Sequence, residues 1–240
     1  MSVDRRRLCV LLGLLLAALA GCDLSGQYEK RYQEALQSSG ARARFDLQLF
    51  PDPTSVTDAK RAPTGVGLRI PAFFNKDSQR LAVNDPRAAI PFLPLPEHLS
   101  DCFERQLDDG NNQFLPTYLY FAAVPKMDDK KVETKVDVLQ ASLLKPLAAA
   151  FPGAAWADVQ LPTPEGKPIT LKRVRVDGQQ DFMNLQTNKF EKKEGRFDLY
   201  FIDSPAHHVL IAWRTPKPQG EKYFYADSEL AMGTVRSGGG

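Results

Sequence analysis

Two hydrophobic periods recur along the chain, and each predicts one kind of element. Apolar residues at every second position predict a strand that begins at Phe45 and ends before Pro51, and a shorter apolar run predicts a strand over 66–71. The stretch 117–124 is apolar on both faces, which is typical of a strand at the centre of a covered sheet. From Asp128 the spacing becomes three and four residues and predicts a helix whose apolar face carries Val132, Val136, Leu139, Leu143 and Leu147.

The sequence also predicts where this helix begins and ends. Asp128 or Asp129 can cap its first turn, and Pro152-Gly153 stops the chain after its last one. Pro146 removes a backbone donor, so we expect either a kink there or two abutting helices.

Between the first strands and this helix lies a segment rich in proline. The prolines at 71–97 exclude a regular helix or a central strand, while the apolar residues among them indicate a long loop that wraps the core. The stretch 97–107 is compatible with a short helix, and the polar turn at 108–113 ends it.

The last third of the chain predicts antiparallel hairpins. The first runs through 169–176, turns at the Asp-Gly pair 177–178 and returns through 179–186. Its apolar residues change parity, which requires a bulge near Lys172 or Arg173 if all of them face one core.

A second hairpin is predicted to pair 196–203 with 208–215, and a short helix follows over 225–236. Arg173 and Arg175 are expected on an exposed strand face.

This order of elements predicts an α+β fold, with an antiparallel sheet covered by helices. The order, together with the pieces VGLRIP and GRFDLYFIDSPAHHVLIAW, loosely resembles the PsbP/Mog1-like fold over 45–235. That resemblance implies a binding or assembly role without a shared catalytic apparatus, but a fold alone does not define a function.

The first residues predict where the protein is located. Three arginines at 5–7 precede an apolar run at 8–19, which is too short to span a bilayer comfortably. The run ends in Leu19-Ala20-Gly21-Cys22, which resembles the lipobox of bacterial lipoproteins. The resemblance implies that the signal peptide 1–21 is removed and that Cys22 carries a diacylglycerol, which would hold the protein at the membrane.

The alternatives are an ordinary signal peptide or an uncleaved anchor. A core helix with a buried thiol is disfavoured because the run lacks a polar stripe. Asp23 resembles an inner-membrane retention signal, which implies the outer side of the cytoplasmic membrane and leaves the outer membrane as the other choice.

Removal of this segment changes the charge. It contains three arginines and one aspartate, so the 31 basic and 29 acidic residues of the whole chain become equal in number. The neutral mature chain lacks the basic excess typical of nucleic-acid binding, and we expect no nucleic-acid partner. The cysteines are three, at positions 9, 22 and 102, so maturation leaves Cys102 without a disulfide partner.

The mature chain divides into a tether, one domain and a tail. Residues 22–44 are expected to form the tether and a short helix, whose stripe of Tyr28, Tyr32 and Leu36 packs on the domain rather than lying at the lipid interface. Residues 45–236 form the α+β domain, and 237–240 form a flexible tail.

The chain contains no familiar catalytic or nucleotide-binding motif, so we assign no catalytic residue and expect no cofactor. One metal site is conceivable. If 97–107 is helical, His98 and Cys102 lie one turn apart, and His207 or His208 could complete a zinc or copper site. The alternative is a buried thiol with three ordinary histidines.

These observations favour a membrane-anchored lipoprotein whose non-catalytic domain binds an envelope protein, as a scaffold or assembly factor. The alternative is a lipoprotein that binds a small molecule or a metal. An envelope enzyme of an unrecognised family ranks last, and a deep pocket lined with convergent polar groups would support it.

Overall fold

The computed structural model describes residues 30–33, 35–36, 39–74, 78–82, 84–90, 92–93, 97–108, 114–128, 130–184 and 186–237. The predicted signal peptide, the lipidation site Cys22, Asp23 and Tyr28 lie outside these residues. No helix among the described residues is long and apolar enough to cross a membrane.

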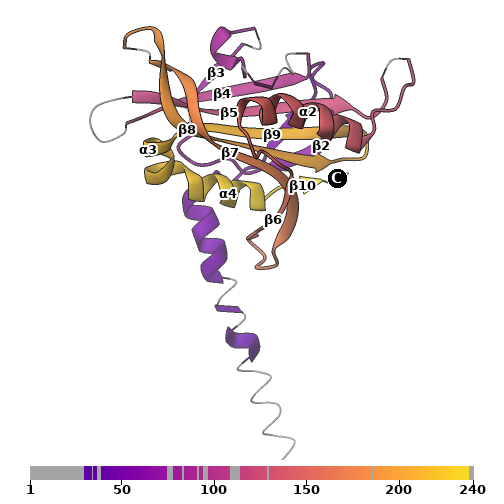
Figure 1. Ribbon diagram of the computed structural model, residues 1–240. Coiled ribbons are helices and arrows are strands. Elements are labelled where there is room, and N and C mark those ends of the chain that lie inside the picture. The colour runs from indigo at the N-terminus through magenta and orange to yellow at the C-terminus, as the bar shows by residue number, and fades with distance from the viewer. Residues whose placement is uncertain are drawn as a thin grey trace, which may run out of the picture.

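A seven-stranded antiparallel sheet forms the centre of the domain, with the order β3-β4-β5-β9-β8-β7-β6 (Figure 1). Its long central strands are buried on both faces, as the sequence predicts for 117–124. The strands are β3 (Gln79–Leu81), β4 (Leu99–Asp108), β5 (Phe114–Pro125), β6 (Ala157–Leu161), β7 (Ile169–Asn184), β8 (Lys189–Asp203) and β9 (His207–Pro216).

One face of this sheet, here called the α2 face, is covered by α2 (Val136–Ala150) and by a segment between β3 and β4. Three leucines of α2 are buried against it: Leu139, Leu143 and Leu147. The segment between β3 and β4 contains the short helix η1 (Pro86–Ala88) and buries Leu93 in the same cluster. The proline-rich stretch therefore wraps the core as predicted.

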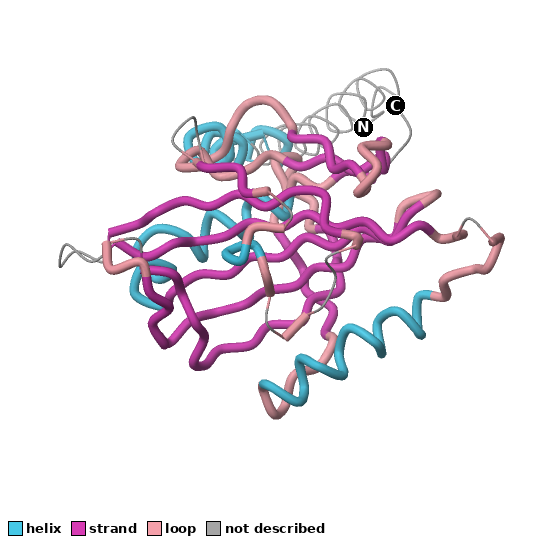
Figure 2. The backbone as a smooth tube through the Cα atoms, turned by 90° about the horizontal axis from the view of Figure 1, so that it is seen from above, coloured by secondary structure: helices cyan, strands magenta, loops and turns pink. Residues whose placement is uncertain are grey.

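The opposite face, here called the α4 face, is covered by α4 (Tyr225–Gly233) and by a three-stranded sheet. That sheet consists of β1 (Thr54–Thr57), β2 (Pro63–Leu68) and β10 (Arg236–Ser237). The turns α3 (Lys217–Gln219) and η2 (Gly220–Phe224) lead from β9 into α4, as Figures 1 and 2 show. Layers of this kind on one antiparallel sheet confirm the predicted α+β class.

The N-terminal segment is helical where the sequence predicts a strand. Residues 39–48 form a helix. Phe45 and Leu49 are four residues apart and are both buried on the α4 face, whereas Leu47 is 83% exposed. Phe45, Leu47 and Leu49 alternate as in a strand, but Phe45 and Leu49 are also spaced by one helical turn. Burial of these two residues on the same face favours the helix.

The predicted helix over 97–107 is also wrong, because this stretch forms β4. Leu99, Cys102, Phe103 and Leu107 fit the helical spacing, yet they also place side chains on both faces of a covered strand. Pairing with β5 over the whole length of β4 decides between the two.

The tight turn at Asp177-Gly178 does not form. β7 continues through this pair to Asn184, with Asp177 opposite Arg196 and Gly178 opposite Gly195. The two strands pair without a register shift, so the expected bulge is absent from them. The parity changes because Val174 and Val176 face the α2 face, while Ile169 and Leu171 pack toward the α4 face.

The second hairpin, β8 with β9, and the C-terminal helix are confirmed. The main helix begins later than predicted, at Val136, and Lys135 takes the cap position instead of Asp128 or Asp129. Val132 is therefore outside the helix and exposed, and Pro146 lies within one continuous helix.

Candidate functional site

A cavity of about 360 Å³ lies on the α2 face, between the sheet and the segment that leads from β3 to β4. Residues 84–90 and 92–93 of that segment, here called the strap, cross the sheet at the top of Figure 1. Strap residues form the roof of the cavity and side chains from β4, β5, β8 and β9 form its floor. The floor consists of Leu99, Tyr120, Ala122, Leu199, Leu210 and Ala212.

Two alanines leave this space in an otherwise filled core. Ala122 lies opposite Leu210 on β9, and Ala212 lies opposite Tyr120 on β5. Because an alanine side chain ends at Cβ, these two positions leave open space below the strap. Most protein interiors contain few voids larger than a water molecule, so a hollow of this size is notable.

A polar cluster fixes the first end of the strap. The Asp85 carboxylate accepts a hydrogen bond from the Arg87 backbone N–H (2.8 Å) and caps η1. Arg87 Nη2 lies 2.7 Å from Asp85 Oδ2, and its Nη1 lies 3.3 Å from Glu104 Oε1 on β4. The Arg87 side chain lowers the pKa of Asp85 through its hydrogen bonds, against the effect of burial. The roof is thus tied to the sheet by a guanidinium group.

Aromatic packing fixes the other end. The Phe92 ring lies edge-on between Phe151, which follows α2, and Phe197 of β8, with centroid distances of 5.0 Å to each. Edge-to-face contacts of this kind are favourable beyond the area that they bury. The strap is therefore held on both sides of the cavity.

Beside the cavity, Arg214 is buried against the end of the β7–β8 hairpin. Its guanidinium lies 4.8 Å from the Phe182 ring centroid and 5.6 Å from that of Tyr118, and its Nε donates to Gln180 Oε1 (3.3 Å). Its Nη2 donates to the Asp181 carbonyl. The ion pairs of the described residues include none to Arg214.

The β7–β8 hairpin can pack against Arg214 because Gly195 has no side chain. A Cβ at Gly195 would lie 2.7 Å from the Phe182 ring, so a side chain at Gly195 would require that ring to move.

The four residues of the predicted metal site do not meet. His98 and His207 line a separate hollow of about 500 Å³, where His207 Nε2 lies 3.5 Å from Asp58 Oδ2. Cys102 belongs to the core of the α2 face, and burial raises its pKa. The described residues contain no group of three or more His, Cys, Asp or Glu that could hold a metal.

His208 faces away from its neighbour His207, as adjacent strand residues do. Its Nδ1 lies 3.0 Å from Asp203 Oδ1, and its Nε2 lies 2.8 Å from the Thr134 carbonyl oxygen. Both ring nitrogens thus face acceptors, so His208 connects β9 to the start of α2. The premise of the metal site, a helix that carries both His98 and Cys102, is wrong because Cys102 lies on strand β4.

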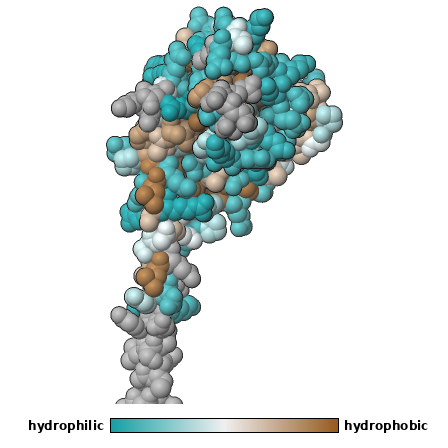
Figure 3. Space-filling view, turned by 90° about the vertical axis from the view of Figure 1, so that its left-hand side faces the viewer, coloured by the Kyte–Doolittle hydropathy of each residue, from teal (hydrophilic) through white to brown (hydrophobic). Residues whose placement is uncertain are grey.

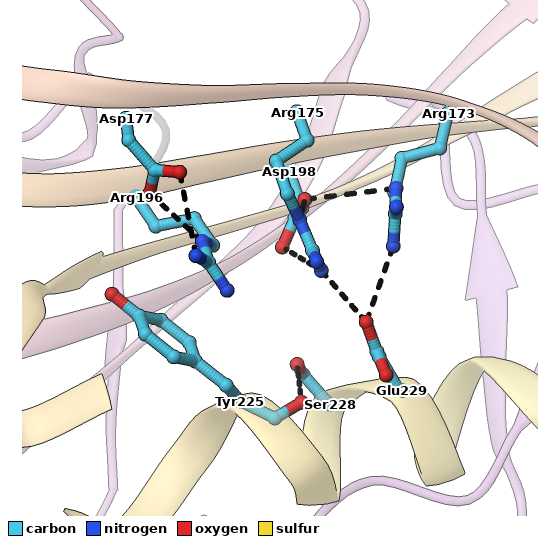
Figure 4. Close-up of polar contacts among 8 residues, drawn as sticks. All are labelled: Arg173, Arg175, Asp177, Arg196, Asp198, Tyr225, Ser228 and Glu229. Atoms are coloured by element: carbon cyan, nitrogen blue, oxygen red, sulfur yellow. Dashed lines mark hydrogen bonds and ion pairs between the residues drawn. The ribbon is translucent and has the colours of Figure 1, made fainter. Parts of the chain in front are cut away.

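An ion-pair cluster that the sequence does not reveal connects the sheet to α4 (Figure 4). Asp198 Oδ1 lies 2.6 Å from Arg175 Nε, and Glu229 Oε1 lies 2.9 Å from Arg175 Nη2 and 3.2 Å from Arg173 Nη1. Both arginines are largely covered rather than exposed as predicted. The only indication in the sequence is an aspartate, Asp198, within an apolar strand.

This cluster satisfies its own charges. Burial raises the pKa of Asp198, while the guanidinium groups of Arg175 and Arg173 oppose that shift. Arg196 lies beside it, paired with Asp177 at 2.8 Å and stacked 4.0 Å from the Tyr225 ring centroid (Figure 4). Because acids and bases alternate across the cluster, we interpret it as the attachment of α4 and not as a ligand site.

Compared with models of known protein families and with curated proteins, the chain matches none.

Proposed function

We propose that the protein is a lipid-anchored lipoprotein of the bacterial envelope whose domain binds a compact, mainly apolar small molecule in the strap cavity. The observation that supports this proposal is the cavity itself, with its apolar floor and a roof fixed at both ends. Its volume of about 360 Å³ is within the range of ligand sites, which is roughly 300–1,000 Å³.

The proposed role is binding rather than catalysis. Catalytic groups need a pKa near the working pH, but burial raises the pKa of both Cys102 and Tyr120 and keeps them protonated. Asp85 at the rim is held as a carboxylate by Arg87. None of these groups is prepared to act as a nucleophile or base, which supports a binding role.

The proposed anchor is compatible with access to the cavity. The helix at 39–48, which would lead from the lipidated Cys22, packs Phe45 and Leu49 on the α4 face, while the cavity lies on the α2 face. Figure 1 shows this helix leaving the domain on the side opposite to the strap. Attachment through Cys22 would therefore leave the strap directed away from the membrane.

Naphthalene is a suitable first probe, because a cavity of about 150 Å³ is already large enough to bind benzene. We expect the full chain to bind it with a measurable dissociation constant in a fluorescence titration. Ala212→Leu, which occupies part of the space above the floor, is expected to weaken binding, and Ala149→Leu on the exposed side of α2 is expected to leave it unchanged. Equal signals from all three proteins would refute the site and reveal mere partitioning into lipid or detergent.

An envelope protein partner is the second candidate, and an exposed apolar group supports it. Four apolar side chains at the start of α2 and in the segment before it are exposed: Met127, Val132, Val136 and Val138, with exposures of 59%, 60%, 37% and 61%. A photo-crosslinker at Val132 is expected to capture a discrete envelope protein in intact membranes, whereas one at exposed Ala149 is not. The absence of a discrete adduct at Val132 would contradict this candidate.

The helix at the N-terminus also exposes apolar side chains. Tyr32 and Leu36 are about half exposed, at 50% and 48%, so they do not pack on the domain as predicted. Figure 3 shows hydrophobic colour on the described part of this helix, whereas most of the visible domain surface is hydrophilic. The exposed stripe is compatible with the lipid interface, the other location that the sequence allows for it.

A further inference from the structure

We propose that the ligand of the strap cavity carries an oxygen acceptor and that the Tyr120 hydroxyl donates a hydrogen bond to it. This inference rests on the proposed function and specifies the class of ligand: an apolar, ring-sized molecule with a carbonyl or carboxylate oxygen at one end. It also makes Tyr120 the residue that determines specificity.

Tyr120 combines burial with an unused donor. Its side chain lines the cavity floor and is only 2% exposed. Arg214 acts on its hydroxyl oxygen as a hydrogen-bond donor, and the hydroxyl proton has no acceptor among the described residues. Buried polar atoms in native proteins are nearly always paired, and an unpaired one costs about 1–3 kcal/mol. A ligand oxygen in the cavity would supply the missing partner.

The groups around Tyr120 do not accept its proton. Arg214, whose charge acts on the Tyr120 hydroxyl, is a guanidinium and can only donate hydrogen bonds. The nearby Glu104 carboxylate uses Oε1 for Arg87 and Gln106, and its Oε2 has no partner among the described residues. The ring of Tyr118 only stacks on that of Tyr120, with centroids 5.8 Å apart.

The charges nearby favour an oxygen over an ammonium group. Burial raises the pKa of Tyr120, so it remains a donor at neutral pH, while the positive charge of Arg214 makes that proton more acidic. The carboxylate whose charge acts on Tyr120 is Glu104, and it is bound to Arg87. Arg214 has no such counter-ion among the described residues. A negative or partly negative ligand atom is therefore favoured beside Tyr120.

The rest of the lining fixes the orientation of the ligand. Leu99, Leu199 and Leu210 with the two alanines offer only carbon atoms, so they can contact only the apolar body. The polar rim residues Asn84 and Asp85 lie in the strap, away from the floor. The ligand would thus place its ring over Ala122 and Ala212 and its oxygen toward Tyr120.

Two isosteric probes test this proposal: 2-acetylnaphthalene and 2-isopropenylnaphthalene, which differ only by exchange of the carbonyl oxygen for CH2. Each is titrated into the wild-type full chain, Tyr120→Phe and Tyr118→Phe. Tyr118→Phe is the matched control, because Tyr118 stacks on Tyr120 but does not line the cavity.

We expect the wild type to bind the ketone about 3- to 10-fold more tightly than the hydrocarbon, the value of one hydrogen bond. Tyr120→Phe should abolish that ratio while leaving the affinity for the hydrocarbon unchanged, and Tyr118→Phe should preserve it. Equal affinities for the two probes in the wild type would overturn the inference and leave the binding function intact. Failure of both probes to bind would overturn the proposed function itself.

Discussion

The strap cavity gives Ala212 a stability response opposite in sign to that of an ordinary buried alanine. Ala212→Leu adds three carbon atoms, which the free volume of about 360 Å³ can receive. Burial of each methylene contributes about 0.8 kcal/mol, and fixing the leucine rotamer costs roughly 0.5–1 kcal/mol. The variant is therefore expected to be more stable by about 1.5–2 kcal/mol, or about 3–8 °C in Tm for a domain of this size.

Ala231→Leu is the matched control for this prediction. Ala231 is fully buried on the α4 face, in the packed core between α4 and the sheet. Extra atoms in a filled core typically destabilise by about 1–3 kcal/mol. Urea unfolding of the full chain and both variants, followed by tryptophan fluorescence, gives the two differences in the free energy of unfolding. Destabilisation of Ala212→Leu by as much as Ala231→Leu would refute the reasoning, because it would mean that the cavity is already filled.

Three further predictions concern the ion pairs and the anchor. Asp198→Ala removes the buried partner of Arg175, which keeps only Glu229, and should lower the free energy of unfolding by about 1–3 kcal/mol, the cost of buried groups that lose their hydrogen bonds; the same urea assay measures it, and an unchanged free energy would contradict the assigned role. Burial raises the pKa of Asp203, but Lys126 and His208 outweigh it and hold the pKa below 3.8. Ionised Asp203 thus stabilises the fold above its ordinary pKa, and this stabilisation decreases as the pH falls, so Asp203→Asn should cost more stability at pH 7 than at pH 3; equal losses at both would disprove the linkage. Cys22→Ala should remove a diacylglyceryl mass and membrane association together, as intact-mass analysis and fractionation would show, and a wild-type chain without lipid would contradict the anchor.

The α+β class could be predicted because long apolar strands and the spacing of Leu139, Leu143 and Leu147 leave few other arrangements. Local ambiguity explains the errors. Phe45 and Leu49 fit either a strand or a helix, and the stretch that forms β4 fits both periods as well. Only contacts with distant residues decide between them.

The Asp177-Gly178 pair illustrates the same limit. Its preference for a tight turn is weaker than the continuous pairing of β7 with β8, in which Arg196 binds Asp177. Turn propensity is a local preference, and tertiary pairing overrides it.

The candidate site could not be predicted from the sequence, for a geometric reason. The cavity exists because Ala122 and Ala212, on two strands far apart in the chain, lie under one strap. Neither alanine differs in the sequence from any other buried alanine. The histidines and Cys102 carried the recognisable chemistry instead, but the sheet separates them onto two faces.

A methyl-resolved NMR titration tests the central claim most directly. The full chain, labelled at leucine methyl groups, is titrated with naphthalene. The leucines that line the cavity, Leu93, Leu99, Leu199 and Leu210, should shift in a saturable way, while Leu68, Leu161 and Leu230 on the α4 face should not. Shifts confined to the α4 face, or spread without saturation over both faces, would contradict the strap cavity as the binding site.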